Sequence, residues 1–87
     1  MTAFKFTVDA RGEAFCRAIA DEMVRLFGIL LEEAVGRINR HWAGQVIAGE
    51  HDLVYHEGSE YWAKTIYYGP HAMWWVRGAK LKPPPYP

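Results

Sequence analysis

The first segment of the chain alternates between apolar and polar positions. Phe4, Phe6 and Val8 are separated by polar side chains over residues 3–8. This period of two is typical of a half-buried strand, because successive side chains of an extended chain point to opposite faces. We therefore predict a strand there. The carboxylate of Asp9 follows and can accept the free backbone N–H groups at the start of a helix.

Two amphipathic helices are predicted next, over residues 10–27 and 31–43, from apolar positions that recur every three or four residues. These positions are Phe15, Ile19, Met23 and Leu26 in the first helix and Leu31, Val35, Ile38 and Trp42 in the second. Gly28 is predicted to end the first helix in a left-handed conformation, and Gly44 to end the second. The short connection indicates that the two helices pack closely, as a corner or hairpin.

A glycine lies in the middle of the second predicted helix, at position 36. Glycine in a helix interior costs about 1 kcal/mol relative to alanine. We therefore expect another part of the chain to approach the helix closely at Gly36.

The second half of the chain is less regular. Residues favoured in β-sheets predict short strands over 52–56 and 72–77, and Ser59 is predicted to cap a short helix over 59–67. A β-hairpin is the competing interpretation for residues 59–77, because residues 69–71, Gly-Pro-His, are flanked by segments rich in strand-forming residues.

Residues 79–87 form an extended proline-rich tail, because consecutive prolines exclude a helix and a central strand. Its Pro83-Pro-Pro-Tyr86 segment is similar to the PPxY ligand of WW domains, a polyproline helix that docks into aromatic grooves. A strap over the protein's own Trp74 or Trp75 is the arrangement we favour, and an external groove and a loose tail are the alternatives.

These elements predict an α+β fold in which two amphipathic helices and a short third helix cover a small sheet of about three strands. The chain has 87 residues, of which 51% are hydrophobic and 23% charged. This length and composition fit one globular domain over residues 1–87.

The charge balance argues against nucleic acid as a partner. Ten Lys and Arg match ten Asp and Glu, so the net attraction that supplies much of the affinity for DNA is missing. The helix pair around Gly28 invites a helix-turn-helix interpretation, but its second helix would open with Glu32 and Glu33, where it should approach phosphates. Nucleic-acid binding is therefore our third hypothesis.

The chain is expected to be a cytoplasmic protein. It shows no signal-peptide pattern and no apolar run of the ~20 residues that cross a bilayer, so a membrane partner is not expected. Cys16 is the single cysteine, which permits no internal disulfide. Because Cys16 lies beside the apolar stripe of the first helix, we expect a buried and unreactive thiol.

A polar site is the basis of our second hypothesis, a ligand- or metal-binding domain or an enzyme, with an aromatic-walled pocket. Its polar groups would come from His51, His56 and Glu57. Histidines at the i,i+4 spacing of a helical metal site are absent from the sequence, and a single cysteine excludes a cysteine-rich zinc site. We therefore predict no metal, cofactor or catalytic residue, and an enzyme is the less favoured interpretation.

The distribution of aromatic residues is the strongest functional signal. All four Trp and all five Tyr lie from residue 42 onward, more large rings than a small domain readily buries. An aromatic-heavy core is the alternative explanation. Tyr, Trp and Arg are the residues that anchor protein interfaces. We therefore predict a non-catalytic interaction domain that binds a protein partner or a second copy, as a homodimer. The predicted surface consists of Trp42, Trp62, Tyr68 and Trp75, with Arg37 and Arg40 at its rim.

Overall fold

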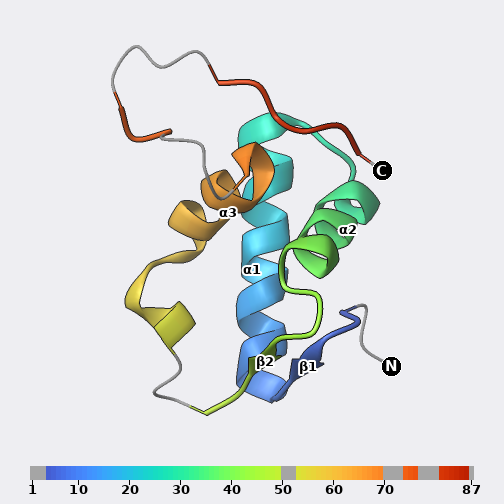
Figure 1. Cartoon of the computed structure of the whole chain (residues 1–87), viewed down its shortest axis with the longest axis vertical. Coiled ribbons are helices and arrows are strands. Elements are labelled where there is room, and N and C mark those ends of the chain that lie inside the picture. The colour runs from blue at the N-terminus through green and yellow to red at the C-terminus, as the bar shows by residue number, and fades with distance from the viewer. Residues whose placement is uncertain (1–3, 50–52, 70–73, 77–80, 87) are drawn as a thin grey trace.

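The computed structural model describes residues 4–49, 53–69, 74–76 and 81–86. This part of the chain contains three α-helices, a two-stranded sheet and a single turn of 3₁₀ helix. The elements are β1 (Thr7–Val8), α1 (Ala10–Phe27), α2 (Leu31–His41), β2 (Val46–Ile47), the 3₁₀ helix (Leu53–His56) and α3 (Ser59–Tyr68). Helix α1 runs through the middle, with α2 and α3 on either side and the strands near its first turn (Figure 1).

Helix α1 has the bounds that its sequence predicts, and both of its ends are capped as expected. At the start, a carboxylate oxygen of Asp9 accepts the backbone N–H of Gly12 at 2.7 Å. At the end, Gly28 adopts the left-handed conformation, with φ of 65°, a region that glycine enters without the penalty of a Cβ atom. The inner face of the helix forms the centre of the core, with Cys16, Ile19, Ala20 and Met23 buried.

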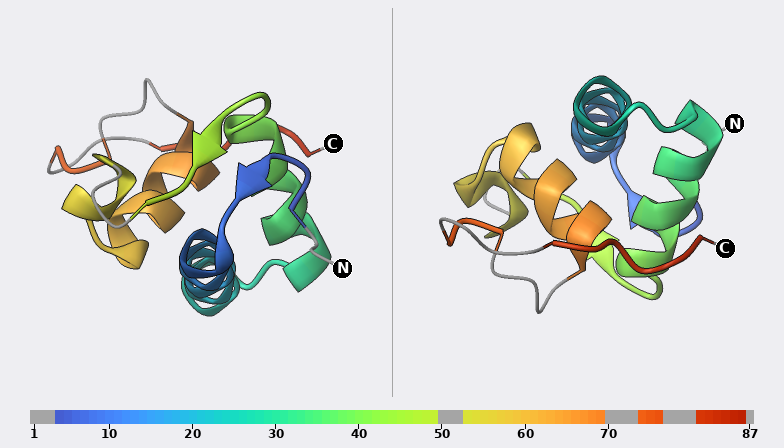
Figure 2. Two further views of the ribbon diagram at one scale, coloured as in Figure 1. Left: turned by 90° about the horizontal axis from the view of Figure 1, so that it is seen from below. Right: turned by 90° about the horizontal axis from the view of Figure 1, so that it is seen from above.

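Helix α2 begins at the predicted residue and ends at His41, two residues before the predicted end. Trp42 follows it, and Gly44, with φ of 78°, lies in the turn after the helix. Ala34 and Ile38 are fully buried. Viewed along its axis, α1 lies beside both other helices (Figure 2).

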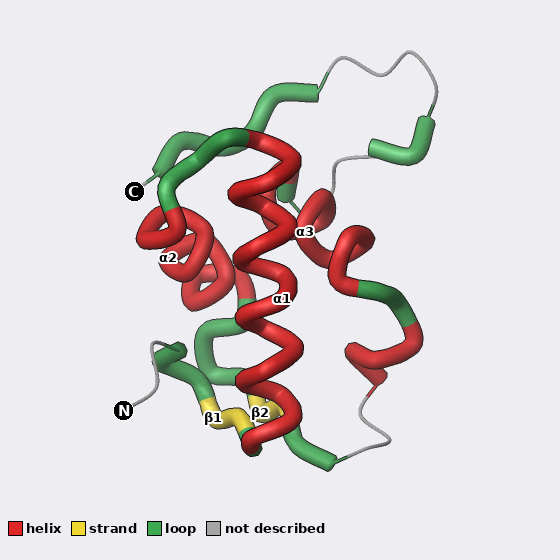
Figure 3. The backbone as a smooth tube through the Cα atoms, turned by 180° about the vertical axis from the view of Figure 1, so that it is seen from behind, coloured by secondary structure: helices red, strands yellow, loops and turns green. Residues whose placement is uncertain are grey.

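The predicted three-stranded sheet is wrong, because the described residues form a sheet of only two strands. Thr7 pairs with Val46 and Val8 with Ile47, in parallel. The strand predicted over residues 3–8 is therefore reduced to its last two residues, although Phe4 and Phe6 are buried as expected. Strand β2 was not predicted. Figure 3 shows the pair near the first turn of α1, on the side of the N-terminus.

The other two predicted strands are corrected as well. Leu53–His56 is a 3₁₀ helix, and the carbonyl of Val54 accepts a hydrogen bond at 2.7 Å from the indole N–H of Trp62 instead of from a neighbouring strand. Residues 74–76 form a turn, while residues 72, 73 and 77 of the third predicted strand lie outside the described part.

Helix α3 spans Ser59–Tyr68, which confirms a helix here in place of a hairpin. The predicted cap is wrong by one residue. Gly58 occupies the cap position with an extended backbone, and Ser59 is already helical. A side-chain cap requires the extended backbone of the residue before the helix, so Ser59 cannot provide one.

The described part of the tail, residues 81–86, has no helix or strand and crosses the end of the helical layer toward α2 (Figure 1). Within the described ranges, we find no helix that combines the length and apolar character required to span a bilayer.

Candidate functional site

A chain of aromatic rings leads from the core to the surface. Trp42 packs against Trp62 with ring centroids 5.2 Å apart, and Trp62 against Tyr61 at 5.3 Å. Tyr61 then contacts Trp74 at 5.6 Å, and Trp74 contacts Trp75 at 5.6 Å. The edge-to-face geometry of all four contacts is favourable for aromatic pairs. These five rings thus connect three separate segments of the chain.

Trp42, at the inner end of this chain, is not part of an exposed surface as we expected. It is only 8% exposed, because it lies in the core with Phe6, at a centroid distance of 5.9 Å. Trp62 is half-buried and held through its hydrogen bond to Val54. Both residues therefore belong to the packing of the domain, and neither presents an open ring.

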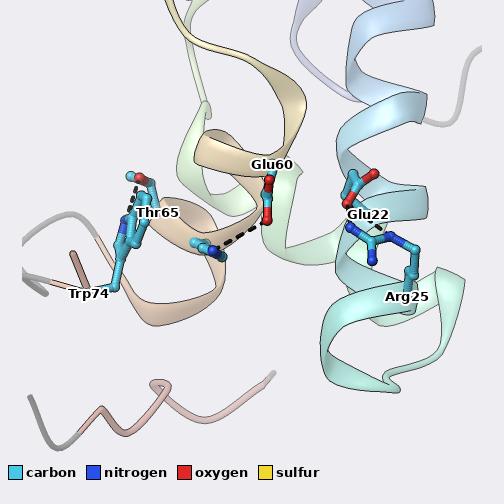
Figure 4. A network of polar contacts seen from close by, with 6 residues as sticks. Glu22, Arg25, Glu60, Thr65 and Trp74 are labelled. Atoms are coloured by element: carbon cyan, nitrogen blue, oxygen red, sulfur yellow. Dashed lines mark hydrogen bonds and ion pairs between the residues drawn. The ribbon is translucent and has the colours of Figure 1, made fainter. Parts of the chain in front are cut away.

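Trp75, at the outer end, is 60% exposed, and its neighbour Val76 is also exposed. The adjacent Trp74 is fixed against α3, because its indole N–H donates to the hydroxyl oxygen of Thr65 at 3.1 Å (Figure 4). The ammonium group of Lys64 lies 5.0 Å from the centre of the Trp74 ring. We call Trp74, Trp75 and Val76 the Trp75 surface.

Tyr68 lies apart from this surface, at the end of α3. Its half-buried ring meets Phe27 edge-on at 5.3 Å. The neighbouring Tyr67 stacks on the same Phe27 ring, with centroids 3.8 Å apart and planes at 7°. The two tyrosines therefore fasten α3 to the end of α1.

Arg37 is buried, against our expectation of a rim residue. It is only 5% exposed. Its Nε donates to a carboxylate oxygen of Glu33 at 2.8 Å, and its Nη1 to the carbonyl of Pro84 at 3.0 Å. Its guanidinium carbon lies 5.0 Å from the ring centre of Tyr67 and 5.6 Å from that of Tyr86. The charge is compensated as a buried charge must be, and the tail is what covers it.

Gly36 and Arg40 complete the contact between α2 and the tail. A Cβ atom at Gly36 would overlap the phenol ring and hydroxyl of Tyr86, which confirms the predicted close approach. Arg40 is exposed and donates from Nη1 to the carbonyl of Pro85 at 3.0 Å. The tail is thus a strap, but its described contacts are with α2, where we expected Trp74 or Trp75. We call Gly36, Arg37 and Arg40 the tail site.

A pocket of about 310 Å³ opens beside the tail site. Its lining consists of Arg37, Arg40, His41, Ile66, Gly69 and Pro84. Burial lowers the pKa of His41 below its ordinary value, so the imidazole is neutral at pH 7. The sequence offered His41 only as one of several candidate metal ligands and did not predict this pocket, because the pocket joins α2 to residues that lie far away in the chain.

The predicted polar site gains no structural support. His56 and Glu57 are exposed, and His51 lies outside the described residues. Within the described ranges, no three His, Cys, Asp or Glu residues are grouped to hold a metal ion. Cys16 is buried as expected, and burial raises the pKa of its thiol to about 12, which leaves it protonated and a poor nucleophile at neutral pH.

Comparisons of the chain with protein-family models, curated proteins and solved structures found no match. The Trp75 surface, the tail site and the pocket are therefore the features that bear on function.

Proposed function

We propose that the protein is a non-catalytic interaction domain of the cytoplasm that associates with a second copy of itself through the Trp75 surface. The observation that carries this proposal is the exposure of Trp75, at 60%, beside an exposed Val76. Tryptophan is enriched among the residues that dominate binding energy, because one ring contributes a large contact area. An exposed tryptophan next to another apolar side chain is therefore a candidate anchor.

Two further properties favour association. Trp74 is held by Thr65 and by the ring of Tyr61, so less conformational freedom is lost when its neighbour meets a partner. Ten basic and ten acidic residues leave no formal net charge, so two copies do not repel each other through their overall charge.

Sedimentation velocity of the full chain over a wide range of protein concentrations tests the proposal. We expect the wild type to shift from monomer to dimer, and Trp75→Ser to shift the transition to much higher concentration. Leu30→Ser is the matched control, since Leu30 is a large exposed apolar residue in the loop between α1 and α2. A wild type that stays monomeric throughout, or an equal effect of both substitutions, would overturn the proposal.

A second candidate function, small-ligand binding, is favoured by the pocket beside the tail site. Two arginines, Arg37 and Arg40, are among its lining residues, together with His41. Guanidinium groups match phosphate and carboxylate geometry, so the expected ligand is a small anion. Inorganic phosphate at constant ionic strength should raise the melting temperature of the wild type more than that of Arg40→Ala. Equal shifts would exclude this function.

A further inference from the structure

The contact between the tail and α2 has the features of a recognition site. Three consecutive residues, Pro84, Pro85 and Tyr86, are each contacted by a different feature of the helix. Arg37 and Arg40 donate to the two proline carbonyls at 3.0 Å each, and Tyr86 lies over Gly36. A tail that merely lay on the surface would not require an ordered set of donors.

The two hydrogen bonds match the chemistry of a proline-rich segment. Proline has no backbone N–H, and a polyproline helix has no internal hydrogen bonds, so its carbonyl groups need donors from elsewhere. Residues 37 and 40 are three positions apart and therefore share one face of α2. Their guanidinium groups thus serve neighbouring carbonyls of one extended segment.

Tyr86 supplies the side-chain part of the recognition. The guanidinium carbons of Arg37 and Arg40 each lie 5.6 Å from the centre of its ring, within the range of a cation–π interaction. The missing side chain of Gly36 leaves the space that the phenol occupies. The tail site therefore selects two carbonyl groups followed by an aromatic ring.

We propose that the tail site also binds residues 84–86 of a second copy, so that two molecules exchange their tails. Each described contact between the tail site and the tail is made to a carbonyl oxygen or to a ring, and none depends on the covalent connection to the same molecule. The chain's own tail is favoured only by its effective concentration, because it belongs to the same molecule as the site. Tail exchange extends the proposed function but is independent of the Trp75 surface, which lies on a different segment.

Two full-length variants separate exchange from the internal contact. Gly36→Ala fills the space for the phenol and disables the site, but it leaves the tail intact. Tyr86→Ala disables the tail but leaves the site intact. Both carry Trp75→Ser in addition, so that association through the Trp75 surface does not contribute. Neither variant pairs with itself, while a mixture offers one intact site and one intact tail.

Fluorescence anisotropy measures the pairing, with a dye on the N-terminal amine of the Tyr86→Ala variant. We expect a saturable rise when the Gly36→Ala variant is added, and loss of that rise when unlabelled Tyr86→Ala is added instead. A flat titration with the Gly36→Ala variant overturns tail exchange, provided that both variants unfold cooperatively. Arg40→Ala, which removes one donor from an exposed position, replaces Gly36→Ala as the disabled site if that variant does not fold.

A synthetic peptide with the sequence of residues 81–87 tests the recognition chemistry separately. It should bind the Tyr86→Ala variant, and the same peptide with alanine in place of the tyrosine should bind much more weakly. Binding of both peptides with equal affinity overturns the assignment of Tyr86. Peptide binding without pairing of the two variants overturns the second copy as the source of the tail. The Trp75→Ser background keeps both results separate from the test of the proposed function.

Discussion

Helices α1 and α2 are both amphipathic in sequence, yet their covered faces are built differently. The covered face of α1 is apolar, and its central residues, Cys16, Ile19, Ala20 and Met23, are completely or almost completely buried. The covered face of α2 combines Ala34 and Ile38 with the buried guanidinium group of Arg37. Part of that face is covered by the tail and not by another helix.

This difference distinguishes the apolar contacts that stabilise the fold from the polar contacts between α2 and the tail. Apolar burial is non-directional and scales with the area removed from water, so the core around α1 requires only apolar neighbours of suitable size. The contact on α2 is directional, since it consists of two hydrogen bonds and a ring over a glycine. The tail contact therefore depends on the placement of particular donors, whereas the core depends on the apolar area that it buries.

The largest effect is expected from a substitution in α1. Ile19→Ala removes a fully buried side chain and should lower the free energy of unfolding by about 2–5 kcal/mol. Urea denaturation followed by tryptophan fluorescence measures the change. Leu30→Ala, at an exposed position, is the control and should stay within about 0.5 kcal/mol of wild type. Equal losses would show that the core is not centred on α1.

Arg37→Ala should give the next largest loss, about 1–3 kcal/mol, since it leaves the carboxylate of Glu33 and the carbonyl of Pro84 without this donor. Arg40→Ala removes a hydrogen bond of the same length to Pro85, but from an exposed side chain, so we expect less than about 1 kcal/mol. Chemical denaturation of both variants tests whether the burial of the arginine determines how much free energy of unfolding is lost. Similar losses would contradict the burial of Arg37.

The contrast between the helices also explains what could be predicted from the sequence. The bounds of α1 follow from local signals: a period in the apolar positions, the carboxylate of Asp9 and the left-handed Gly28. The sheet does not follow, because its strands have two residues each and no alternation can be recognised over so short a length. Strand β2 pairs with residues about forty positions earlier, a non-local contact that local patterns do not encode.

The tail site could be predicted only in part, for the same reason. Gly36 indicated a close approach and the prolines indicated an extended strap, both from local properties. The contact between Gly36 and Tyr86, however, joins residues about fifty positions apart. Arg37 was expected at a rim because arginine beside Trp and Tyr is typical of interface hot spots, and its burial depends on Glu33, Pro84 and two tyrosine rings. The partners of Gly36 and Arg37 therefore had to come from the structure.

The carboxylate of Asp9 stabilises the start of α1, and a substitution there tests how much this end of the helix contributes to stability. The backbone N–H groups of Gly49 and Gly12 donate to its carboxylate and lower its pKa below 3.8. The ionised form therefore stabilises the fold at neutral pH, and this contribution is lost as the pH falls through the lowered pKa. Asp9→Asn should melt at a lower temperature than wild type at pH 7, with the gap narrowing below pH ~3.8. If the difference in melting temperature does not change with pH, the effect comes from the shape of the side chain and not from its charge.

The smallest expected effect lies at the end of α2, where two influences on His41 oppose each other. A positive charge near a helix C-terminus is favoured by the helix dipole, whereas burial disfavours the charged imidazole and lowers its pKa below 6.5. Because the unfolded chain then binds a proton more readily, stability should decrease as the pH falls from about 6.5 toward the lowered pKa.

His41→Phe retains a ring beside Trp42 but cannot titrate, so its stability should fall less over this range. Thermal unfolding of both proteins between pH 5 and pH 7.5 measures the difference, and the remaining histidines cancel in it. A wild type that gains stability relative to His41→Phe on acidification would show that the dipole outweighs burial here, and that the end of α2 is more open to water than the core around α1.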